Sequence, residues 1–291
     1  CTIVAWTLVS GNIRRRGEHI RRGAGAIAAG RHLRDADIGL AAGVGVSTLA
    51  VCRRLRVGIL STGDELADPP QALGPGGSFD ANRPLLRAAL ERSGFEVHDL
   101  GICRDTSQAF ASTLARARQL GLDALVASGG AAQGDADVVR AASGVRFVPL
   151  AVRPGRGLAF ARIEGDGPTL ALFGLPGNAV AAYVVFHLLV RPLLIRLAGG
   201  RAEVPLHVPL PLAGPVRVRP GRIDYRRASF TRDDAGRLRV APLREQGSAM
   251  LRTVTDADAL IAVGPEESYA EGDPDAYWRG REGTGRFSMN Q

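Results

Sequence analysis

The stretch Val57-Gly58-Ile59-Leu60-Ser61-Thr62-Gly63-Asp64-Glu65 decides the fold, because an apolar run gives way there to glycine and acidic residues. Two further apolar runs end in a similar way, at Ser128-Gly129-Gly130 and at Gly174-Leu175-Pro176-Gly177-Asn178. Each pattern predicts a strand that ends in a glycine turn, which is where an open parallel sheet places its ligand. Glycines let backbone N–H groups approach a phosphate, whereas the interleaved carboxylates call for a bridging divalent cation. The sequence therefore predicts a phosphorylated ligand together with a metal ion.

Residues 56–200 alternate between short apolar runs and segments of helical periodicity. Strands are predicted at 57–61, 96–100, 124–127 and 169–173, and helices at 82–93, at 107–120 and after Asn178, which can cap the long helix that follows. Repeated strand–helix–strand units predict an α/β fold, with a parallel sheet and helices on both of its faces.

The rest of the chain has a different character. Residues 1–55 are rich in Gly and Arg, which predicts a partial β-rich domain. Residues 201–275 contain Pro-punctuated apolar runs, and Asp233-Asp234-Ala235-Gly236 lies between two of them, so we expect a small β domain with a hairpin there. The polar tail 276–291 is predicted to be disordered. Because the sequence starts at Cys1 within an apolar run, we expect a truncated N-terminus and a fragment of a longer protein.

Composition narrows the class of protein. The chain has 291 residues, 45% hydrophobic and 23% charged, as a soluble protein of more than one domain would. The net charge is +8, but all 37 basic residues are Arg, which indicates coding bias, and aromatic residues make up only 5%, so we predict no nucleic-acid partner. Charged residues and a proline interrupt the apolar stretch Ala179 to Ala198, which favours a buried helix over a membrane span. With no secretory signal pattern and three cysteines in no metal or redox motif, a cytoplasmic protein is expected.

Acidic and basic residues recur where the predicted strands end. Asp64 and Glu65 could hold Mg²⁺ or could cap a turn, and further carboxylates follow two later strands, at Asp105 and in Gly134-Asp135-Ala136-Asp137. Arg153-Pro154-Gly155-Arg156 suits an oxyanion or phosphate, because guanidinium groups donate in pairs, although an ordinary charged hairpin tip has the same composition. The Gly174 to Asn178 turn is either a phosphate site at the positive end of a helix or a plain helix start.

At these residues the chain resembles the molybdopterin molybdenumtransferases of molybdenum cofactor biosynthesis, a family that includes the corresponding domain of gephyrin. The matching stretches are Ser61 to Leu66, Phe79-Asp80-Ala81-Asn82-Arg83, Ser128 to Asp137, Arg153 to Phe160, Gly174 to Asn178, Asp224 to Phe230 and Arg244 to Leu251. Molybdopterin adenylyltransferases and competence-damage-inducible proteins share the strand-end motifs but lack the flanking β segments. The resemblance therefore favours the transferase family over these relatives.

The resemblance implies that molybdate is inserted into adenylylated molybdopterin, with Mg²⁺ assistance and release of AMP. It implies catalytic roles for Glu65, Asp105, Asp137, Arg153 and Arg156, with the arginines holding molybdate or phosphate. Cofactor-binding residues would be Thr62, Gly63, Ser128, Gly129, Gly130, Gly177 and Asn178, and metal ligands Glu65, Asp135 and Asp137. It also implies a homodimer, an upstream molybdopterin adenylyltransferase and downstream molybdoenzymes as partners.

The chain departs from the family pattern in ways that keep alternatives open. Positions 153 and 156 are Arg where the family often has Lys, and the family's N-terminal segment is missing. The chain is therefore interpreted as the transferase, with a catalytically incomplete molybdopterin-binding fragment and a dimerising scaffold as the alternatives.

Overall fold

The computed structural model of the chain describes residues 15–129, 138–142, 144–165, 168–201, 207–217, 221–264, 268–269 and 277–280. It divides into two compact units, one of Cys1–Cys52 with Gly199–Arg201 and one of Arg53–Ala198 with Ala202–Gln291. The second unit carries the sheets and every predicted site residue.

The described part of the first unit contains a helix rather than strands. α1 spans Asp35–Gly43, and residues 15–52 hold no strand where the structure describes them, so the predicted β-rich fold is wrong for these residues. The local reason is a helix start: the Asp37 carboxylate accepts from Arg34 N at 3.0 Å and from Arg31 Nε at 3.0 Å. Acidic groups in a first turn are favoured by the helix dipole, and these contacts compete with extended backbone.

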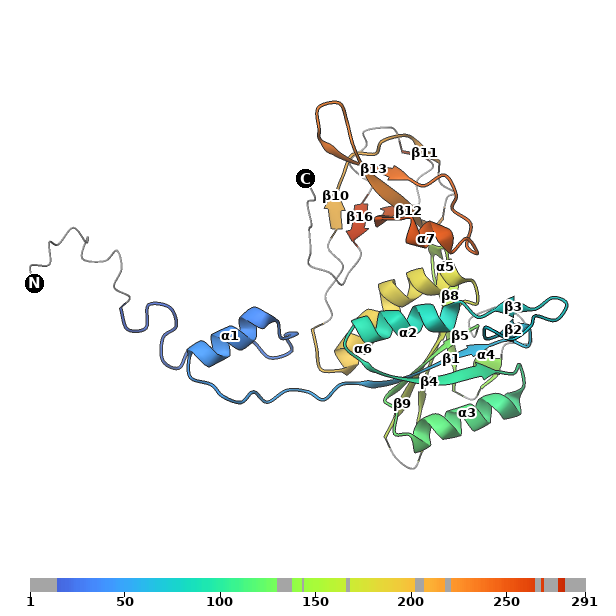
Figure 1. The fold of residues 1–291 in the computed structure, drawn as a ribbon, viewed down its shortest axis with the longest axis horizontal. Coiled ribbons are helices and arrows are strands. Elements are labelled where there is room, and N and C mark those ends of the chain that lie inside the picture. Colours follow the sequence, from blue (N-terminus) through green and yellow to red (C-terminus); the bar gives the residue numbers. More distant parts are fainter. Residues whose placement is uncertain are drawn as a thin grey trace, which may run out of the picture. The chain divides into compact units, whose positions relative to one another are not determined.

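A six-stranded sheet forms the centre of the second unit and confirms the α/β prediction (Figure 1). Its order is β4 (Glu96–Cys103), β1 (Arg56–Thr62), β5 (Ala124–Ser128), β9 (Leu170–Leu175), β8 (Gly157–Ile163) and β6 (Arg146–Pro149). The first four strands are parallel, whereas β8 and β6 are antiparallel to their neighbours. The carboxyl ends of β4, β1, β5 and β9 therefore meet at one edge.

Helices cover both faces of this sheet, as expected (Figure 1). One face carries α2 (Asn82–Arg92) and the continuous helix formed by α5 (Ala179–Val185), the π-helical segment η1 (Phe186–Val190) and α6 (Arg191–Leu197). The other carries α3 (Ser107–Gln119) and the short α4 (Val138–Ala141). Successive strand side chains alternate between the two cores: Ala124 and Val126 of β5 lie in one, Leu125 and Ala127 in the other.

Among the described residues, one helix, Ala179–Leu197, has the length and the apolar composition that a membrane span needs, with a mean hydropathy of 1.8. Its apolar side chains are used in the core instead, because Val185, Phe186, Val190 and Leu194 are fully buried against the sheet and α2. An apolar helix packed on a sheet face satisfies the same hydropathy test.

A second sheet forms the C-terminal β domain. Its order is β10 (His207–Pro209), β16 (Tyr277–Gly280), β14 (Ala259–Val263), β12 (Ile223–Arg232) and β13 (Leu238–Pro242), and β7 (Val152–Arg153) also pairs with β12. β12 and β13 form the predicted hairpin. The short elements β2 (Leu66–Ala67), β3 (Ser78–Phe79), β11 (Val216–Arg217), β15 (Ser268–Tyr269) and α7 (Arg252–Thr255) complete the structure.

The sheet extends past the predicted domain end at residue 275. Residues 277–280 lie in the tail that is predicted to be disordered, but they form β16, which pairs antiparallel with β14 and β10. Tyr277 and Trp278 are strand-favouring aromatic residues, and the neighbouring Arg279 and Gly280 concealed that signal.

Candidate functional site

The predicted turns gather at the carboxyl edge of the parallel strands. Ser128 of β5 lies opposite Ser61 of β1 on one side and opposite Leu175 of β9 on the other. Thr62 and Ser128 are buried, and the Thr62 hydroxyl donates to the Ser128 carbonyl at 3.4 Å. The structure therefore brings Thr62, Gly63, Ser128, Gly129, Gly177 and Asn178 to one edge, with Asp105 beyond the end of β4.

Glycine is required at Gly129, but its N–H is already used. Its φ is +104°, and a Cβ there would lie 2.4 Å from Thr62 Oγ1 and 2.7 Å from the Thr62 carbonyl oxygen. The Gly129 N–H donates to Leu175 O at 3.1 Å, and the Gly63 N–H likewise donates to Cys103 O at 3.2 Å. These two glycines thus let neighbouring parts of the chain, Thr62 and Glu65, pack closely against the backbone, and their own N–H groups are used within the protein.

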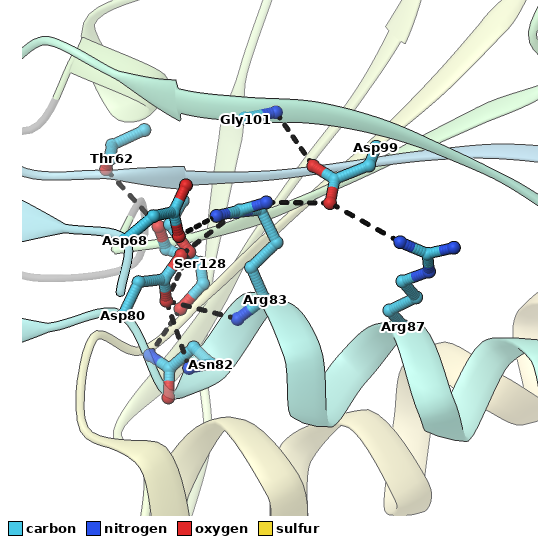
Figure 2. A network of polar contacts seen from close by, with 10 residues as sticks. Thr62, Asp68, Asp80, Asn82, Arg83, Arg87, Asp99, Gly101 and Ser128 are labelled. Atoms are coloured by element: carbon cyan, nitrogen blue, oxygen red, sulfur yellow. Dashed lines mark hydrogen bonds and ion pairs between the residues drawn. The ribbon is translucent and has the colours of Figure 1, made fainter. Parts of the chain in front are cut away.

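A network of polar side chains connects this edge of the sheet to the start of α2 (Figure 2). Asn82 Nδ2, at the start of α2, lies 2.6 Å from both Ser128 Oγ and the Gly177 carbonyl oxygen. The buried Asp80 carboxylate accepts from Ser61 Oγ at 3.0 Å and from the N–H groups of Asn82 and Arg83. Asp80, rather than Asn82, therefore provides the side-chain oxygen at the N-terminus of α2.

Arg83 carries the positive charge of this network. Its guanidinium contacts the carboxylates of Asp68, Asp80 and Asp99, and Figure 2 shows it extending from α2 between them. Burial lowers the pKa of Arg83, but the Asp99 hydrogen bond and the three carboxylate charges outweigh this and raise it. Conversely, burial raises the pKa of Asp99, and the bonds from Arg83 and Gly101 N–H reverse that shift and lower it. The pair is fully charged at neutral pH.

The acidic residues at the edge lie farther out. Asp64 is exposed, and its Oδ1 accepts from Asp105 N at 3.3 Å and lies 3.6 Å from Arg104. The Glu65 carboxylate folds back over Gly63, where an added Cβ would lie 2.7 Å from Glu65 Oε2. Among the described residues, no three His, Cys, Asp or Glu side chains lie close enough to hold a metal ion. Gly130, Asp135 and Asp137 lie outside the described residues, so the proposed metal ligands stay a prediction.

The arginine turn lies beside the Gly174 to Asn178 turn. Arg153 is the last residue of β7, and its backbone lies opposite that of Asp224 in the parallel pairing of β7 with β12. Arg156 is exposed just before β8. Gly155, with a φ of +103°, packs so closely that a Cβ would lie 2.7 Å from Val185 Cγ2 and 4.0 Å from Pro176 Cγ. Two motifs predicted separately from sequence are therefore neighbours in the structure.

The C-terminal β domain also reaches this edge. Asn178 precedes α5 without capping it, and its Nδ2 lies 3.3 Å from Ser248 Oγ instead, while Val180 N donates to Ser248 O at 3.2 Å. Arg227, 1% exposed, holds this loop by donating to Gly247 O at 3.1 Å and to Thr253 Oγ1 at 3.0 Å. Burial lowers the pKa of Arg227.

Sequence reasoning did not assign Asp80, Asn82, Arg83 or Ser248 to the site. All four lie in stretches that the family resemblance had picked out, Phe79 to Arg83 and Arg244 to Leu251. The available signal was a short Asp-x-Asn-Arg segment before an early helical Pro84, which is typical of a helix N-terminus. Its link to Ser128, 46 positions away from Asn82, is visible only in three dimensions.

Comparison with known proteins accords with this geometry. Residues 58–196 match the model of a probable molybdopterin binding domain, and residues 209–274 match the MoeA C-terminal region (domain IV). The molybdopterin molybdenumtransferase of Haemophilus influenzae is 33% identical over 261 residues, covering 88% of this chain and 63% of that protein. The enzyme of the same name from Synechococcus elongatus is 33% identical over 271 residues, covering 90% and 64%.

A solved structure agrees with the sequence relatives. The molybdopterin biosynthesis MoeA protein of Pyrococcus horikoshii superposes with a TM-score of 0.73 at 27% identity, covering 91% of this chain and 64% of that chain. The chain thus spans somewhat less than two thirds of the length of each of these relatives. With both characteristic domains matched in order, the chain belongs to the MoeA family of molybdopterin molybdenumtransferases.

Proposed function

We propose that this chain binds adenylylated molybdopterin at the carboxyl edge of its parallel sheet and inserts molybdate into it, with release of AMP. The observation that carries the proposal is the convergence of three turns at one edge, after β1, β5 and β9, with the arginine turn beside them. Relatives named molybdopterin molybdenumtransferases match nearly nine tenths of the chain, which supports the same reaction class.

The proposed roles follow from the chemistry of each turn. The space beside Gly129 is filled by Thr62, whereas a Cβ at Gly177 would meet only Gly129 Cα, at 3.8 Å, so the pterin phosphate can approach the backbone closely at Gly177. Arg153 and Arg156 supply guanidinium groups, which suit the tetrahedral oxyanions of molybdate and phosphate. Developing negative charge on the departing AMP phosphate would be stabilised by these fixed cations.

Magnesium enters the proposal as an expected requirement. Its oxygen ligands would be Glu65, Asp135 and Asp137, with Asp105 nearby, since hard cations bind carboxylate oxygens. The described carboxylates alone do not make a metal site. Dependence of AMP release on added Mg²⁺, measured with Asp137→Ala beside the unchanged chain, tests the ligand set.

The deciding experiment measures molybdate-dependent AMP release from adenylylated molybdopterin by this chain and by Arg153→Ala and Arg156→Ala variants. Removal of an anion-stabilising donor is expected to reduce turnover by about 100-fold. Arg162→Ala is the matched control, because Arg162 is an exposed β8 arginine paired with Glu164 at 3.6 Å, and should keep full turnover. Pterin binding without AMP release would instead identify a binding fragment. Equal losses in all three variants would refute the assigned roles.

We also propose that the chain acts as a homodimer in the cytoplasm, receiving its substrate from a molybdopterin adenylyltransferase and serving molybdoenzymes. The family resemblance supports this arrangement. Light scattering of the purified chain should give twice the 30.6 kDa mass of one copy, and a monomer mass would contradict the dimer.

A further inference from the structure

The Asn82 side chain connects two turns, those after β5 and after β9, at a point where the backbone hydrogen bonds between these strands have ended. Its Nδ2 lies 2.6 Å from Ser128 Oγ, at the end of β5, and 2.6 Å from the Gly177 carbonyl oxygen, beyond the end of β9. A carbonyl oxygen only accepts hydrogen bonds, so the amide must present its NH₂ group to Gly177, and both amide hydrogens are then used.

This bridge sets the spacing of the predicted ligand edge. Backbone pairing between β5 and β9 ends with the bond from Gly129 N to Leu175 O. Beyond it, the two turns approach until a Cβ at Gly177 would lie 3.8 Å from Gly129 Cα. Among the described residues, no backbone hydrogen bond joins these two turns beyond that point, and the Asn82 side chain connects them instead.

Asp80 in turn fixes Asn82. The Asp80 side chain is 1% exposed and accepts from Ser61 Oγ, from the N–H groups of Asn82 and Arg83, and from Arg83 Nε at 3.1 Å. A buried carboxylate with this many donors is held in one position, because rotating it would break several of these hydrogen bonds at once without water to replace them. The start of α2 is thereby locked to β1, and Asn82 is aimed at β5 and at the turn after β9 (Figure 2).

We propose that Asp80 and Asn82 are positioning residues for the phosphate-bearing ligand. Asp80 fixes the start of α2, and Asn82 holds the Ser128-Gly129 turn and the Gly177-Asn178 turn at the separation that the ligand requires. The identity of that ligand rests on the proposed function, whereas the bridge itself is a property of this chain.

Asn82→Asp is the sharpest test, because it preserves shape while replacing a donor with an acceptor facing the Gly177 carbonyl. Three quantities are measured on the full chain: amide hydrogen exchange of residues 126–129 and 174–178 by mass spectrometry, the Kd of AMP by calorimetry, and Tm. We expect exchange in both segments to accelerate by about tenfold or more and AMP affinity to fall by about tenfold, the size of one lost hydrogen bond.

Asp99→Asn is the matched control. It removes one partner of Arg83 but touches neither Asn82 nor the turns, and Asp68 and Asp80 still pair with Arg83. Exchange in both segments and AMP affinity should therefore stay within about twofold of the unchanged chain, which is below the effect of a typical hydrogen bond. Asn82→Ala provides a second bridge-breaking variant, and Asp80→Asn tests the support behind it.

The outcomes separate the bridge from general stability. A loss of AMP affinity and faster exchange in Asn82→Asp, with Tm close to that of Asp99→Asn, supports positioning. Unchanged exchange and affinity in both Asn82 variants overturn it, as does an equal loss in Asp99→Asn. If the unchanged chain neither binds nor releases AMP, the proposed function fails, and the exchange measurement alone still decides whether Asn82 holds the turns.

Discussion

Substituting Gly129 by alanine isolates the closest packing at the candidate site. The residue follows β5 with a φ of +104°, and the added methyl group would lie 2.4 Å from Thr62 Oγ1 and 2.7 Å from the Thr62 carbonyl oxygen. The hydroxyl can rotate away, but the carbonyl belongs to β1, where Thr62 is paired with Cys103 of β4. Either β1 or the turn after β5 must therefore shift.

The cost can be built from two contributions. A left-handed backbone conformation costs a non-glycine residue about 1–2 kcal/mol. Forcing a methyl group against fixed backbone costs about 1–3 kcal/mol more, as in other overpacked sites. The free energy of unfolding of Gly129→Ala should thus fall by about 2–5 kcal/mol, with the shift felt at Thr62 and Ser128.

Gly236→Ala separates the two contributions. Gly236 has a φ of +77° in the β12–β13 hairpin, with nothing within 4 Å of an added Cβ, so it carries the conformational cost alone. Thermal unfolding of both variants is compared with that of the unchanged chain, together with AMP affinity. A larger Tm loss and weaker AMP binding are expected for Gly129→Ala. Equal Tm losses would refute the close packing, because only the shared φ penalty would then be operating.

Two further substitutions test contacts that the sequence did not reveal. Arg227→Met removes the donor to Gly247 O, so amide exchange of residues 244–251 should accelerate by about tenfold or more; unchanged exchange would contradict the anchoring role. Asp123 accepts from Arg53 at 2.6 and 2.7 Å, and this bond lowers the pKa of Asp123. Its stabilisation is complete above the unfolded carboxyl pKa of about 4 and is lost as pH falls through the lower folded value. Asp123→Asn should therefore lower Tm at pH 7 more than at pH 3, and equal losses at both pH values would contradict this linkage.

The parallel core was predictable because its signals are local. A strand buried on both faces reads as a continuous apolar run, and β1 and β5 do so from Val57 to Leu60 and from Ala124 to Ala127. The direction of a strand depends on its neighbours in the sheet, which can be far away in sequence. The apolar runs of β8 and β6 therefore did not reveal that these two strands are antiparallel to their neighbours. The prediction of a β-rich N-terminal segment was wrong for a different reason. The many glycines and arginines of this segment obscure the contact between Asp37 and Arg34 that starts α1.

The site was predictable as a location but not as a set of contacts. Glycine turns after buried strands mark the edge, because parallel strands bring their carboxyl ends together. Which polar group holds which turn depends on pairs far apart in sequence, such as Asn82 with Gly177. The sequence also suggested that Gly129 would offer its N–H to a phosphate, whereas in the structure this N–H donates to the Leu175 carbonyl oxygen.

The turn from Gly174 to Asn178 is contacted by three segments, and two of them lead into the C-terminal sheet. Asn82 contacts it from α2, Gly155 packs beside it in the turn that begins with β7, and Ser248 meets Asn178 from the loop held by Arg227. β7 pairs with β12, the strand that also carries Arg227. A displacement of β12 would therefore move both the arginine turn and Ser248 relative to the parallel sheet. For this reason the C-terminal sheet is part of the construction of the candidate site, and mutations in β12 should alter ligand affinity as well as stability.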